Sequence, residues 1–462
     1  MKDNLKKSVA LKVVRSLRRA GFQAYFAGGC VRDYLRRKEP VDYDIATDAR
    51  PTQVQRLFKK TIAVGKAFGV IKVLQNGFEF EVTTFRTEGP YLDGRHPSSV
   101  KFSSLENDVQ RRDFTINGMV YDPIAKKVID LVGGRKDLKQ KLIRAIGDPL
   151  ARFNEDKLRM LRAVRFAVEL DFIIEPKTKH AIRLLSPEIK MVSAERIRDE
   201  LKKILISPRR AEGIDLLDKT GLLTQILPEV SRMKGVKQPP QFHPEGDVYT
   251  HTLLALTHLP RYSRGLKKTS PASHPSGRGS PEAAPVGGWE LALATLLHDV
   301  GKPATFMISD RIRFHEHERV GAEMTLKICE RLKLSTAEKE KVTELVSRHM
   351  VFKDAGKMRV STMKRLFRLP HYQELAELHR ADRLASDLDL KPYHFCARMY
   401  RKLSKEELKP KPLINGYDLI ALGLKPGPIF SKILKKVEEA QLEKEIGTKK
   451  QAVQLARKIA GL

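Results

Sequence analysis

Cysteine and long apolar runs are scarce in this sequence, and each scarcity narrows the class of protein. The 462 residues include three cysteines, Cys30, Cys329 and Cys396, without Cys-x-x-Cys spacing. This argues against a disulfide framework or a zinc ribbon and predicts a cytoplasmic location. No apolar run reaches the roughly 18 residues that a transmembrane helix needs. The basic N-terminal stretch lacks the apolar core of a secretory signal, and its helical spacing of apolar residues predicts the first helix of a domain.

Acidic residues are also scarce relative to basic ones. The chain has 56 Asp and Glu against 87 Lys and Arg, a formal net charge of +31. Such an excess favours a polyanionic partner, nucleic acid first, and general solubility is the alternative explanation. With 41% apolar and 31% charged residues, the composition is that of a soluble globular protein of roughly two to four domains.

The order of strand-like and helix-like segments predicts an α+β head followed by mostly helical domains. Short β-type runs, among them QAYFAGG, DYDIAT, GVIKVLQ, FEFEVTTF and KVIDLV, lie before residue 133. Helical patterns such as AERIRDELKKIL follow. A Ser-, Pro- and Gly-rich stretch at about 261–288 predicts a disordered insert. We therefore expect a head at 1–147, a neck at 148–235, a third helical domain at 236–395 and a basic C-terminal segment at 396–462.

The segment AGGCVRDYL, followed by DYDIAT, is the strongest local signal for a phosphate and metal site. Gly28 and Gly29 end a predicted strand and precede a predicted helix, where backbone N–H groups can approach a phosphate. Arg32 is placed to contact the same oxyanion. Asp42 and Asp44 are two residues apart, so on a strand both carboxylates face one side and can hold Mg²⁺. A glycine turn beside a solvated acidic loop is the structural alternative.

The segment RRDFTINGM adds a second candidate anion site. Arg111 and Arg112 are adjacent, and Asp113 follows them. Paired guanidinium groups suit anion binding, and we expect Asp113 to hold one of them in place. A surface ion-pair cluster is the alternative.

Five motifs occur in a characteristic order: GGCVRDYL, DYDIAT, RRDFTINGM, GDPLARFNEDKLRMLRAVRFA and VSAERIRDELKKIL. Together they resemble the class II tRNA nucleotidyltransferase and bacterial poly(A) polymerase family, a branch of the polymerase-β-like nucleotidyltransferases, over about residues 20–230. The resemblance implies that Asp42 and Asp44 carry two Mg²⁺ ions for in-line attack of an RNA 3′-hydroxyl on the α-phosphate of an NTP. It also implies that Gly29 and Arg32 hold the triphosphate.

The segment EDKLR suggests how bases are selected without a nucleic-acid template. Asp156 and Arg159 are three residues apart and share one face of the predicted helix. A carboxylate accepts from the exocyclic amines of C and A, a guanidinium donates to their ring acceptors, and U and G present the opposite pattern. The resemblance implies this role. Arg162 and Arg165 continue the same face toward phosphates or an RNA backbone, and an ordinary salt-bridged helix face is the alternative.

Three local features refine the resemblance. The long polar loop TFRTEGPYLDGRHPSSVKF resembles the flexible loop of members that add the terminal A, so a CC-only enzyme is not expected. Arg36 and Arg37 replace the Leu-Gly of the usual RDxLLG pattern, so we expect the turn into DYDIAT to be shaped differently. Gly118 stands where alanine is common.

A second set of metal-ligand side chains lies between residues 236 and 395, in the order H…HD…D. The candidate ligands are His251, His298, Asp299 and Asp382, with His317 and His349 placed for a second metal or a substrate phosphate. Imidazole and carboxylate groups suit a divalent transition metal such as Mn, Ni or Fe, and buried structural histidines are the alternative. The stretch resembles the HD phosphohydrolase superfamily, which implies phosphatase or phosphodiesterase activity. Glu316 stands where relatives often carry glycine.

The C-terminal segment is basic, with fourteen Lys and Arg against seven Asp and Glu in residues 401–462. It resembles the end of HD-containing family members and predicts contacts to RNA phosphates. Overall the sequence predicts an enzyme that adds C and A from CTP and ATP to the 3′ end of tRNA, without a membrane partner. The alternatives are an A-adding tRNA enzyme or poly(A) polymerase, and an HD-type metal-dependent phosphohydrolase whose head only binds nucleotide. The oligomeric state stays open.

Overall fold

The computed structural model describes residues 2–65, 69–89, 99–261 and 288–462, which form two compact units. The first unit contains Met1–Ser231 and Arg331–Lys333, and the second contains Arg232–Glu330 and Leu334–Leu462. The finer division into four domains stays a prediction. The insert expected at about 261–288, and residues 90–98 of the expected flexible loop, lie outside the described residues.

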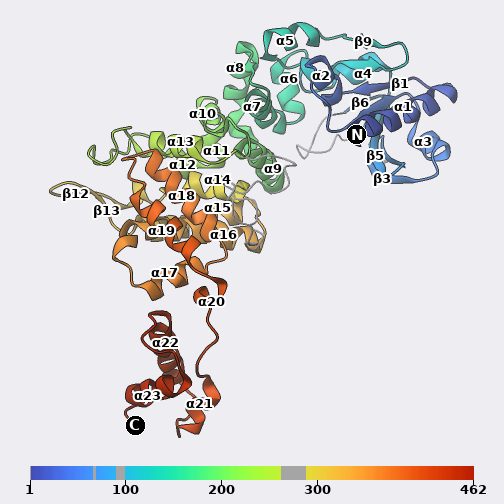
Figure 1. Cartoon of the computed structure of the whole chain (residues 1–462). Coiled ribbons are helices and arrows are strands. Elements are labelled where there is room, and N and C mark those ends of the chain that lie inside the picture. The colour runs from blue at the N-terminus through green and yellow to red at the C-terminus, as the bar shows by residue number, and fades with distance from the viewer. Residues whose placement is uncertain (1, 66–68, 90–98, 262–287) are drawn as a thin grey trace. The chain divides into compact units, whose positions relative to one another are not determined.

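The first unit is built on a seven-stranded mixed sheet (Figure 1). Its strand order is β3 (Thr61–Gly65), β4 (Val70–Gln75), β5 (Phe78–Thr84), β2 (Asp44–Thr47), β1 (Ala24–Ala27), β8 (Val120–Asp122) and β9 (Lys127–Ile129). β1 pairs antiparallel with β2 and β8, whereas β2 and β5 run parallel. Each of the five β-type runs named from the sequence contains one of these strands.

Alternating side chains of the central strands pack against helices on both faces of the sheet. Phe26 and Ile45 face the core that includes Val13 of α1 (Lys2–Arg19). Tyr25 and Ala46 face the opposite core, which α4 (Leu105–Gln110) covers with Leu105 and Val109. The predicted N-terminal helix is therefore confirmed as part of the head. Connecting elements are α2 (Gly29–Leu35), α3 (Pro51–Leu57), β6 (Arg86–Glu88), β7 (Val100–Phe102), the 3-10 turn η2 (Thr115–Asn117) and α5 (Gly134–Gln140).

The rest of the first unit is mostly helical, as predicted. Its helices are α6 (Pro149–Glu155), α7 (Leu158–Leu170), α8 (Pro176–Leu185), α9 (Ala194–Leu205), α10 (Arg210–Lys219), α11 (Leu222–Ile226) and α12 (Pro228–Ser231), with the 3-10 turn η3 (Ser186–Met191). One short parallel pair, β10 (Leu142–Ile143) with β11 (Ile173–Ile174), was not predicted. Two residues are too few to show the alternation that marks a strand.

The second unit is helical apart from one hairpin, β12 (Phe306–Ile308) with β13 (Ile312–Phe314). Its first helices are α13 (Val248–His258), α14 (Trp289–Leu297), α15 (His317–Arg331), α16 (Thr336–Arg348), α17 (Val360–Phe367), α18 (Tyr372–Leu384), α19 (Lys391–Lys402) and α20 (Lys405–Leu408), with η4 (Lys302–Thr305) and η5 (His349–Lys357). The last three are α21 (Gly416–Ala421), α22 (Pro428–Leu442) and α23 (Lys449–Ala460), which share a separate core around Leu419, Ile433 and Ala452. The α+β class is confirmed. No described helix combines the length and apolar character needed to span a bilayer.

Candidate active site

A cavity of about 530 Å³ in the first unit collects most of the predicted head and neck residues. Of the predicted set, Gly28, Gly29, Arg32, Asp44, Arg111, Arg112, Asp156, Arg159 and Arg162 line it. Asp42 and Arg165 are absent from the lining. The motifs are far apart in the sequence, so the fold supplies the convergence that the family resemblance implied.

The glycine turn leaves room beside the Asp44 carboxylate. Gly28 has φ +73°, a left-handed conformation that favours glycine. A Cβ at this position would lie 3.7 Å from Asp44 Oδ2 and 3.7 Å from Arg112 Nη1. Arg32 follows in α2, where its guanidinium donates to the Asp33 carboxylate at 2.9 Å and to Asn117 Oδ1 at 2.9 Å. These bonds fix Arg32 at the edge of the cavity.

The two predicted metal carboxylates are placed differently from what a continuous strand would give. β2 begins at Asp44, so Asp42 lies in the preceding loop and does not share a strand face with Asp44. The Asp42 side chain is 75% exposed and accepts from Lys6 Nζ at 2.6 Å. The sequence argument from strand alternation was therefore wrong for Asp42, because the strand starts two residues later than expected.

Glu81 is a carboxylate of this cavity that the sequence reasoning missed. It lies on β5, and the parallel pairing of Ile45 with Val82 sets it beside Asp44. Asp44 is solvent-exposed as a residue, yet desolvation of its carboxylate and the neighbouring charge of Glu81 raise the pKa of Asp44 to about 6, against the opposing effect of Arg112. The alternation in FEFEV marks Glu81 as an outward residue of a strand. The position of that strand next to β2 needs the fold.

A buried carboxylate other than the predicted one orients the arginine pair. Asp108, which is fully buried, accepts from Arg111 Nη2 at 2.6 Å and from Arg112 Nη2 at 2.9 Å. Asp113 does hold one guanidinium, but that of Arg162, whose Nε donates to Asp113 Oδ2 at 2.9 Å. The expected pairing within Arg111–Asp113 is thus corrected. Side chains three and four residues apart meet more readily than neighbours do at the end of a helix, and α4 ends at Gln110, directly before the two arginines.

Asp113 connects the head to α7 through an ion pair that is largely removed from water. Its carboxylate also accepts from the Phe114 N–H at 2.8 Å and from Asn117 Nδ2 at 3.2 Å. Burial alone would raise the pKa of Asp113, but Arg162 and these hydrogen bonds lower it to about 2. The Asp113 carboxylate is therefore ionised at neutral pH and held in place in the cavity wall.

The EDKLR segment spans a break between two helices and not one continuous helix. α6 ends at Glu155, and Asp156 has the extended angles φ −140° and ψ 105° before α7 begins. Asp156 Oδ2 accepts from Arg196 Nη2 at 2.9 Å. Arg159 donates to Glu155 Oε2 at 2.7 Å and to the carbonyl oxygen of Arg111 at 2.8 Å. Asp156 and Arg159 still reach the same cavity, held by separate partners.

Arg165 lies away from the cavity. It is 7% exposed, its Nε lies 3.3 Å from Glu200 Oε2, and its guanidinium stacks over Phe166 at 4.1 Å. The contact with α9 indicates a packing position, so the expected extension of the arginine face ends at Arg162.

The second unit brings all six predicted histidine and aspartate ligands into two adjoining clusters. His251, His298 and Asp382 form one, with His251 Nε2 at 3.3 Å from His298 Nε2 and 3.1 Å from Asp382 Oδ1. Asp299, His317 and His349 form the other, with the two Nε2 atoms 3.2 Å apart. All six residues are buried.

Asp299 lies between the two clusters. Its Oδ2 is 3.2 Å from His298 Nε2, and its Oδ1 is 3.4 Å from His317 Nε2. Lys302, which is also buried, places Nζ 2.7 Å from the same Oδ2 and 2.7 Å from Gln238 Oε1. One carboxylate thus faces both sets of imidazole nitrogens.

The outer ring nitrogens of the four histidines are all hydrogen-bonded to acceptors. The pairs are His251 with Glu245 Oε1 (2.6 Å), His298 with the carbonyl of Thr295 (2.8 Å), His317 with that of Phe314 (3.1 Å) and His349 with that of Val346 (2.7 Å). Because these oxygens only accept, each Nδ1 carries the hydrogen and each Nε2 of a neutral ring presents a lone pair. Lone pairs 3.3 Å apart (His251 and His298) and 3.2 Å apart (His317 and His349) repel unless a proton or a metal ion lies between them. Imidazole nitrogens and carboxylates gathered in this way form a donor set that fits divalent metal ions. Glu245 is a supporting residue that the sequence reasoning missed.

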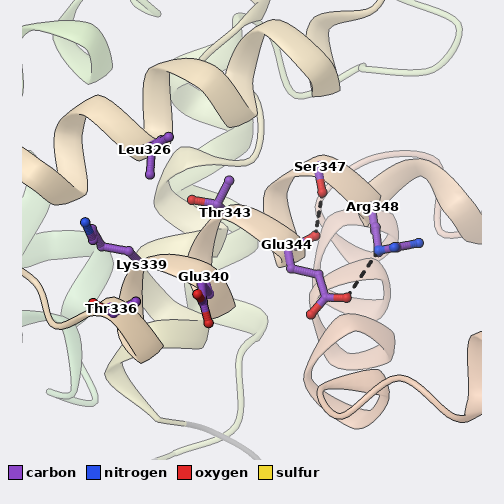
Figure 2. Close-up of a pocket in the computed structure, with 8 residues that line it drawn as sticks. All are labelled: Leu326, Thr336, Lys339, Glu340, Thr343, Glu344, Ser347 and Arg348. Atoms are coloured by element: carbon purple, nitrogen blue, oxygen red, sulfur yellow. Dashed lines mark hydrogen bonds and ion pairs between the residues drawn. The ribbon is translucent and has the colours of Figure 1, made fainter.

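A further hollow lies on the surface of α15 and α16 (Figure 2). Along α16, the Glu344 carboxylate pairs with Arg348 Nε at 3.3 Å, and Ser347 Oγ donates to the Glu344 carbonyl at 3.0 Å. These interactions run within one helix, and none of the metal-ligand clusters found among the described residues includes a residue of this hollow. It indicates a solvated helix face.

Comparison with known families matches four segments of the chain. A model described as "Poly A polymerase head domain" matches residues 24–144, and "Probable RNA and SrmB-binding site of polymerase A" matches residues 171–234. An HD domain matches residues 248–387, and tRNA nucleotidyltransferase domain 2 matches residues 320–456. The matched segments include the histidine–aspartate clusters and the head residues of the cavity, whereas Asp156, Arg159 and Arg162 lie between the first two matches.

Curated relatives match about half of the chain. The CCA-adding enzyme of Bacillus subtilis is 49% identical over 218 residues, 47% of this chain and 55% of the relative. That of Anoxybacillus flavithermus is 45% identical over 226 residues, 49% of this chain and 56% of the relative. The chain therefore spans little more than half the length of these relatives at that similarity.

A solved structure extends the likeness over the whole chain. The crystal structure of the Bacillus stearothermophilus CCA-adding enzyme in complex with CTP has a TM-score of 0.71 and 27% identity, covering 98% of each chain. The Thermotoga maritima CCA-adding enzyme complexed with tRNA shares the fold, with a TM-score of 0.59 and 19% identity over 96% of this chain and 93% of that one.

Fold and site together define a polymerase-type nucleotidyltransferase head joined to an HD domain. The chain belongs to the tRNA nucleotidyltransferase and poly(A) polymerase family. Both kinds of domain imply the use of divalent metal ions.

Proposed function

We propose that the chain is a template-independent RNA nucleotidyltransferase that adds C and A residues from CTP and ATP to the 3′ end of tRNA. The observation that carries this proposal is the cavity in which carboxylates, fixed arginines and the Asp156–Arg159 pair converge. Relatives of similar sequence and fold, named CCA-adding enzymes and solved with CTP, support the same conclusion.

The carboxylates and arginines have separable roles in this proposal. Asp42 and Asp44 would hold Mg²⁺, with Glu81 as a third oxygen donor nearby. The metal ions would lower the pKa of the attacking 3′-hydroxyl and neutralise the triphosphate. Asp42 must release Lys6 to take part. Gly28 and Gly29 leave space for the phosphates.

The arginines would bind the triphosphate before reaction. Arg111 and Arg112 are oriented by Asp108, so two guanidinium groups face the cavity with little rotamer freedom left to lose. Arg32, held by Asn117, would add a third donor. This pre-organised set stabilises the charge that moves onto the leaving pyrophosphate.

Asp156 and Arg159 would select the base. The Asp156 carboxylate, already bonded to Arg196, keeps lone pairs for the exocyclic amine of C or A. The Arg159 guanidinium is anchored by Glu155 and would donate to a ring acceptor. Arg162 supports this wall through Asp113 and does not read the base in this scheme.

The test is single-nucleotide sizing of products on tRNA ending before CCA, after C and after CC, each with CTP, ATP or both plus Mg²⁺. We expect growth from the shortest substrate to CCA and then arrest, and no addition by the Asp42→Ala variant. Addition only to the CC-ended tRNA would indicate an A-adding enzyme. Long A tails would indicate a poly(A) polymerase. No addition to any substrate would contradict the proposal.

A second candidate function is favoured by the two clusters that meet at Asp299. We propose that they bind two divalent transition metals, Mn, Ni or Fe, and hydrolyse phosphoesters. His251, His298 and Asp382 would hold one ion, and His317 and His349 the other, with Asp299 shared. The metals would supply an activated water and polarise the phosphate. Chelation followed by readdition of Mn²⁺ should abolish and restore hydrolysis of bis(p-nitrophenyl) phosphate. Hydrolysis that survives metal removal would contradict this function.

We also propose that the C-terminal segment at 396–462 contacts RNA phosphates. Lys425, Lys432, Lys435 and Lys436 lie on or next to α22, whose apolar side packs in the C-terminal core. Lysines on an otherwise packed helix suit sequence-independent phosphate binding. No single lysine is assigned.

A cytosolic location is a further part of the proposal. Cys30, Cys329 and Cys396 are all buried free thiols, a state that persists in a reducing compartment.

A further inference from the structure

Two adjoining hollows lie on the first unit at the end of α2, outside the cavity described above. One, of about 740 Å³, is lined by basic residues that follow α2, by basic residues of α5 and by Phe172. The other, of about 480 Å³, is lined by Phe26, Tyr34, Tyr43 and Tyr121 with Lys7 and Arg37 at its rim. Both include Leu35 and Lys38, so they adjoin at the end of α2, and we call the two together the α2 groove.

Eight Lys and Arg line the α2 groove, and six of them, from three parts of the chain, are exposed. These six are Lys7 of α1, Arg37 and Lys38 after α2, Arg135 and Lys139 of α5, and Lys141 just beyond it. None of the six forms an ion pair with a described residue, and all are exposed. By contrast, Arg209 of the same groove is paired with Asp171 and Glu212. The lining also includes the carboxylates of Glu39, Glu169 and Asp171, so the groove carries an excess of positive charge. Its six exposed cations form no ion pairs among the described residues, unlike the paired arginines of the cavity.

Aromatic rings accompany these cations. The Tyr34 side chain is 43% exposed and lies 4.9 Å from the ring of Tyr121. Lys7 Nζ lies 5.5 Å from the Tyr34 centroid. An exposed ring backed by a second ring, within a basic depression, offers a stacking surface for an unpaired base beside partners for its phosphates.

We propose that the α2 groove binds single-stranded RNA, with phosphates on the six cations and a base stacked on Tyr34. Cations on three separate elements match a polyanion that extends across both hollows better than a small anion, which a single cluster would satisfy. The exposed ring distinguishes single strands from duplexes, whose bases are already stacked. This surface goes beyond the proposed function, because it contains no residue assigned to nucleotide addition.

The test measures binding of the full chain to a labelled single-stranded RNA of about 12 nucleotides by fluorescence anisotropy across a salt series. The groove variant is R135Q/K139Q/K141Q. The control K59Q/K60Q/K190Q removes the same charge at exposed lysines elsewhere on the first unit. Each phosphate contact to a single strand contributes about 0.7 to the slope of log affinity against log salt, so the groove variant should lower that slope by about 2. Equal slopes for the groove variant and the control would overturn the proposal.

Stacking is tested separately with Tyr34→Leu and Tyr34→Phe. Tyr34→Leu should weaken single-stranded RNA by about fivefold or more while leaving duplex binding unchanged, and Tyr34→Phe should retain affinity. The stacking role would be refuted if both variants lost the same affinity for single-stranded RNA. It would also be refuted if Tyr34→Leu weakened duplex binding as much as single-strand binding. Nucleotide addition at saturating tRNA is the independent readout: groove variants should keep wild-type kcat. A chain that adds no nucleotide yet shows this RNA binding would refute only the proposed function.

Discussion

The ion pair between Asp113 and Arg162 provides a quantitative test of how the cavity wall is held. Asp113 is 9% exposed, and its pKa is lowered to about 2. Relative to an ordinary aspartate near 3.9, that lowering corresponds to about 2–3 kcal/mol of stabilisation at neutral pH. Removing one partner of a buried pair typically costs about 3–5 kcal/mol. Since Arg162 keeps 32% of its side chain exposed, we expect Arg162→Met to cost about 3 kcal/mol.

The chain offers an internal control for this measurement. Its single tryptophan, Trp289, lies buried in α14 of the second unit. Arg162→Met should therefore lower the urea midpoint of the first unit, measured by hydrogen exchange of the α7 amides. The urea transition of Trp289 fluorescence should stay unchanged. Adding Asp113→Asn should recover part of the loss, because no unpaired buried charge remains. A double variant less stable than Arg162→Met alone would refute the reasoning.

The same pair predicts a pH dependence with a definite sign. Because the fold lowers the pKa of Asp113 to about 2, the stabilisation is complete above the unfolded value near 3.9 and is lost as the pH falls toward 2. The difference in α7 hydrogen-exchange protection between the wild type and Asp113→Asn should be constant from about pH 7 to 5 and shrink below about 4. A difference that grows on acidification would contradict the assignment.

Three further changes test individual contacts. Lys6→Met should shift the Mg²⁺ concentration for half-maximal nucleotide addition by no more than about fivefold, because an exposed ion pair with Asp42 contributes about 0–1 kcal/mol. A larger shift would show a direct role for the lysine. Glu245→Gln should weaken Mn²⁺ binding at the HD clusters by about 10–100-fold in a metal titration, since His251 loses its charged partner. Unchanged Mn²⁺ affinity would refute the supporting role of Glu245. Arg159→Ala should relax the preference for C and A in competition with U before it abolishes transfer, and uniform loss with all four nucleotides would contradict base selection.

The sequence predicted which segments carry chemistry better than it predicted how their side chains pair. The glycine turn, the arginine pair and the H…HD…D order all lie where the fold gathers them. Asp108 was missed because a buried aspartate on a short helix looks like any other acidic residue. Only the packing shows that Asp108 holds Arg111 and Arg112, leaving Asp113 to Arg162.

Glu81 shows a second limit of sequence reasoning. Its strand was predicted, and the alternation marked it as an outward residue. Its position beside Asp44 depends on β5 joining β2 in parallel, a pairing between strands 30 or more residues apart. Strand order in a mixed sheet is set by packing on both faces, here by the cores against α1 and α4. The local sequence pattern therefore does not predict which strands are neighbours in the sheet.

The backbone is left-handed at two positions where the family resemblance would place glycine. Arg37 has φ 56° and Glu316 has φ 53°, both in the left-handed region that L-residues other than glycine rarely adopt. Each costs roughly 1–2 kcal/mol relative to ordinary helical angles. The turn after α2 therefore contains a left-handed residue at Arg37, and the different shape expected for this turn stays a prediction. The Arg37 side chain lines the α2 groove, where a glycine would contribute no charge. The same substitution that strains the backbone thus adds one of the six exposed cations of that groove.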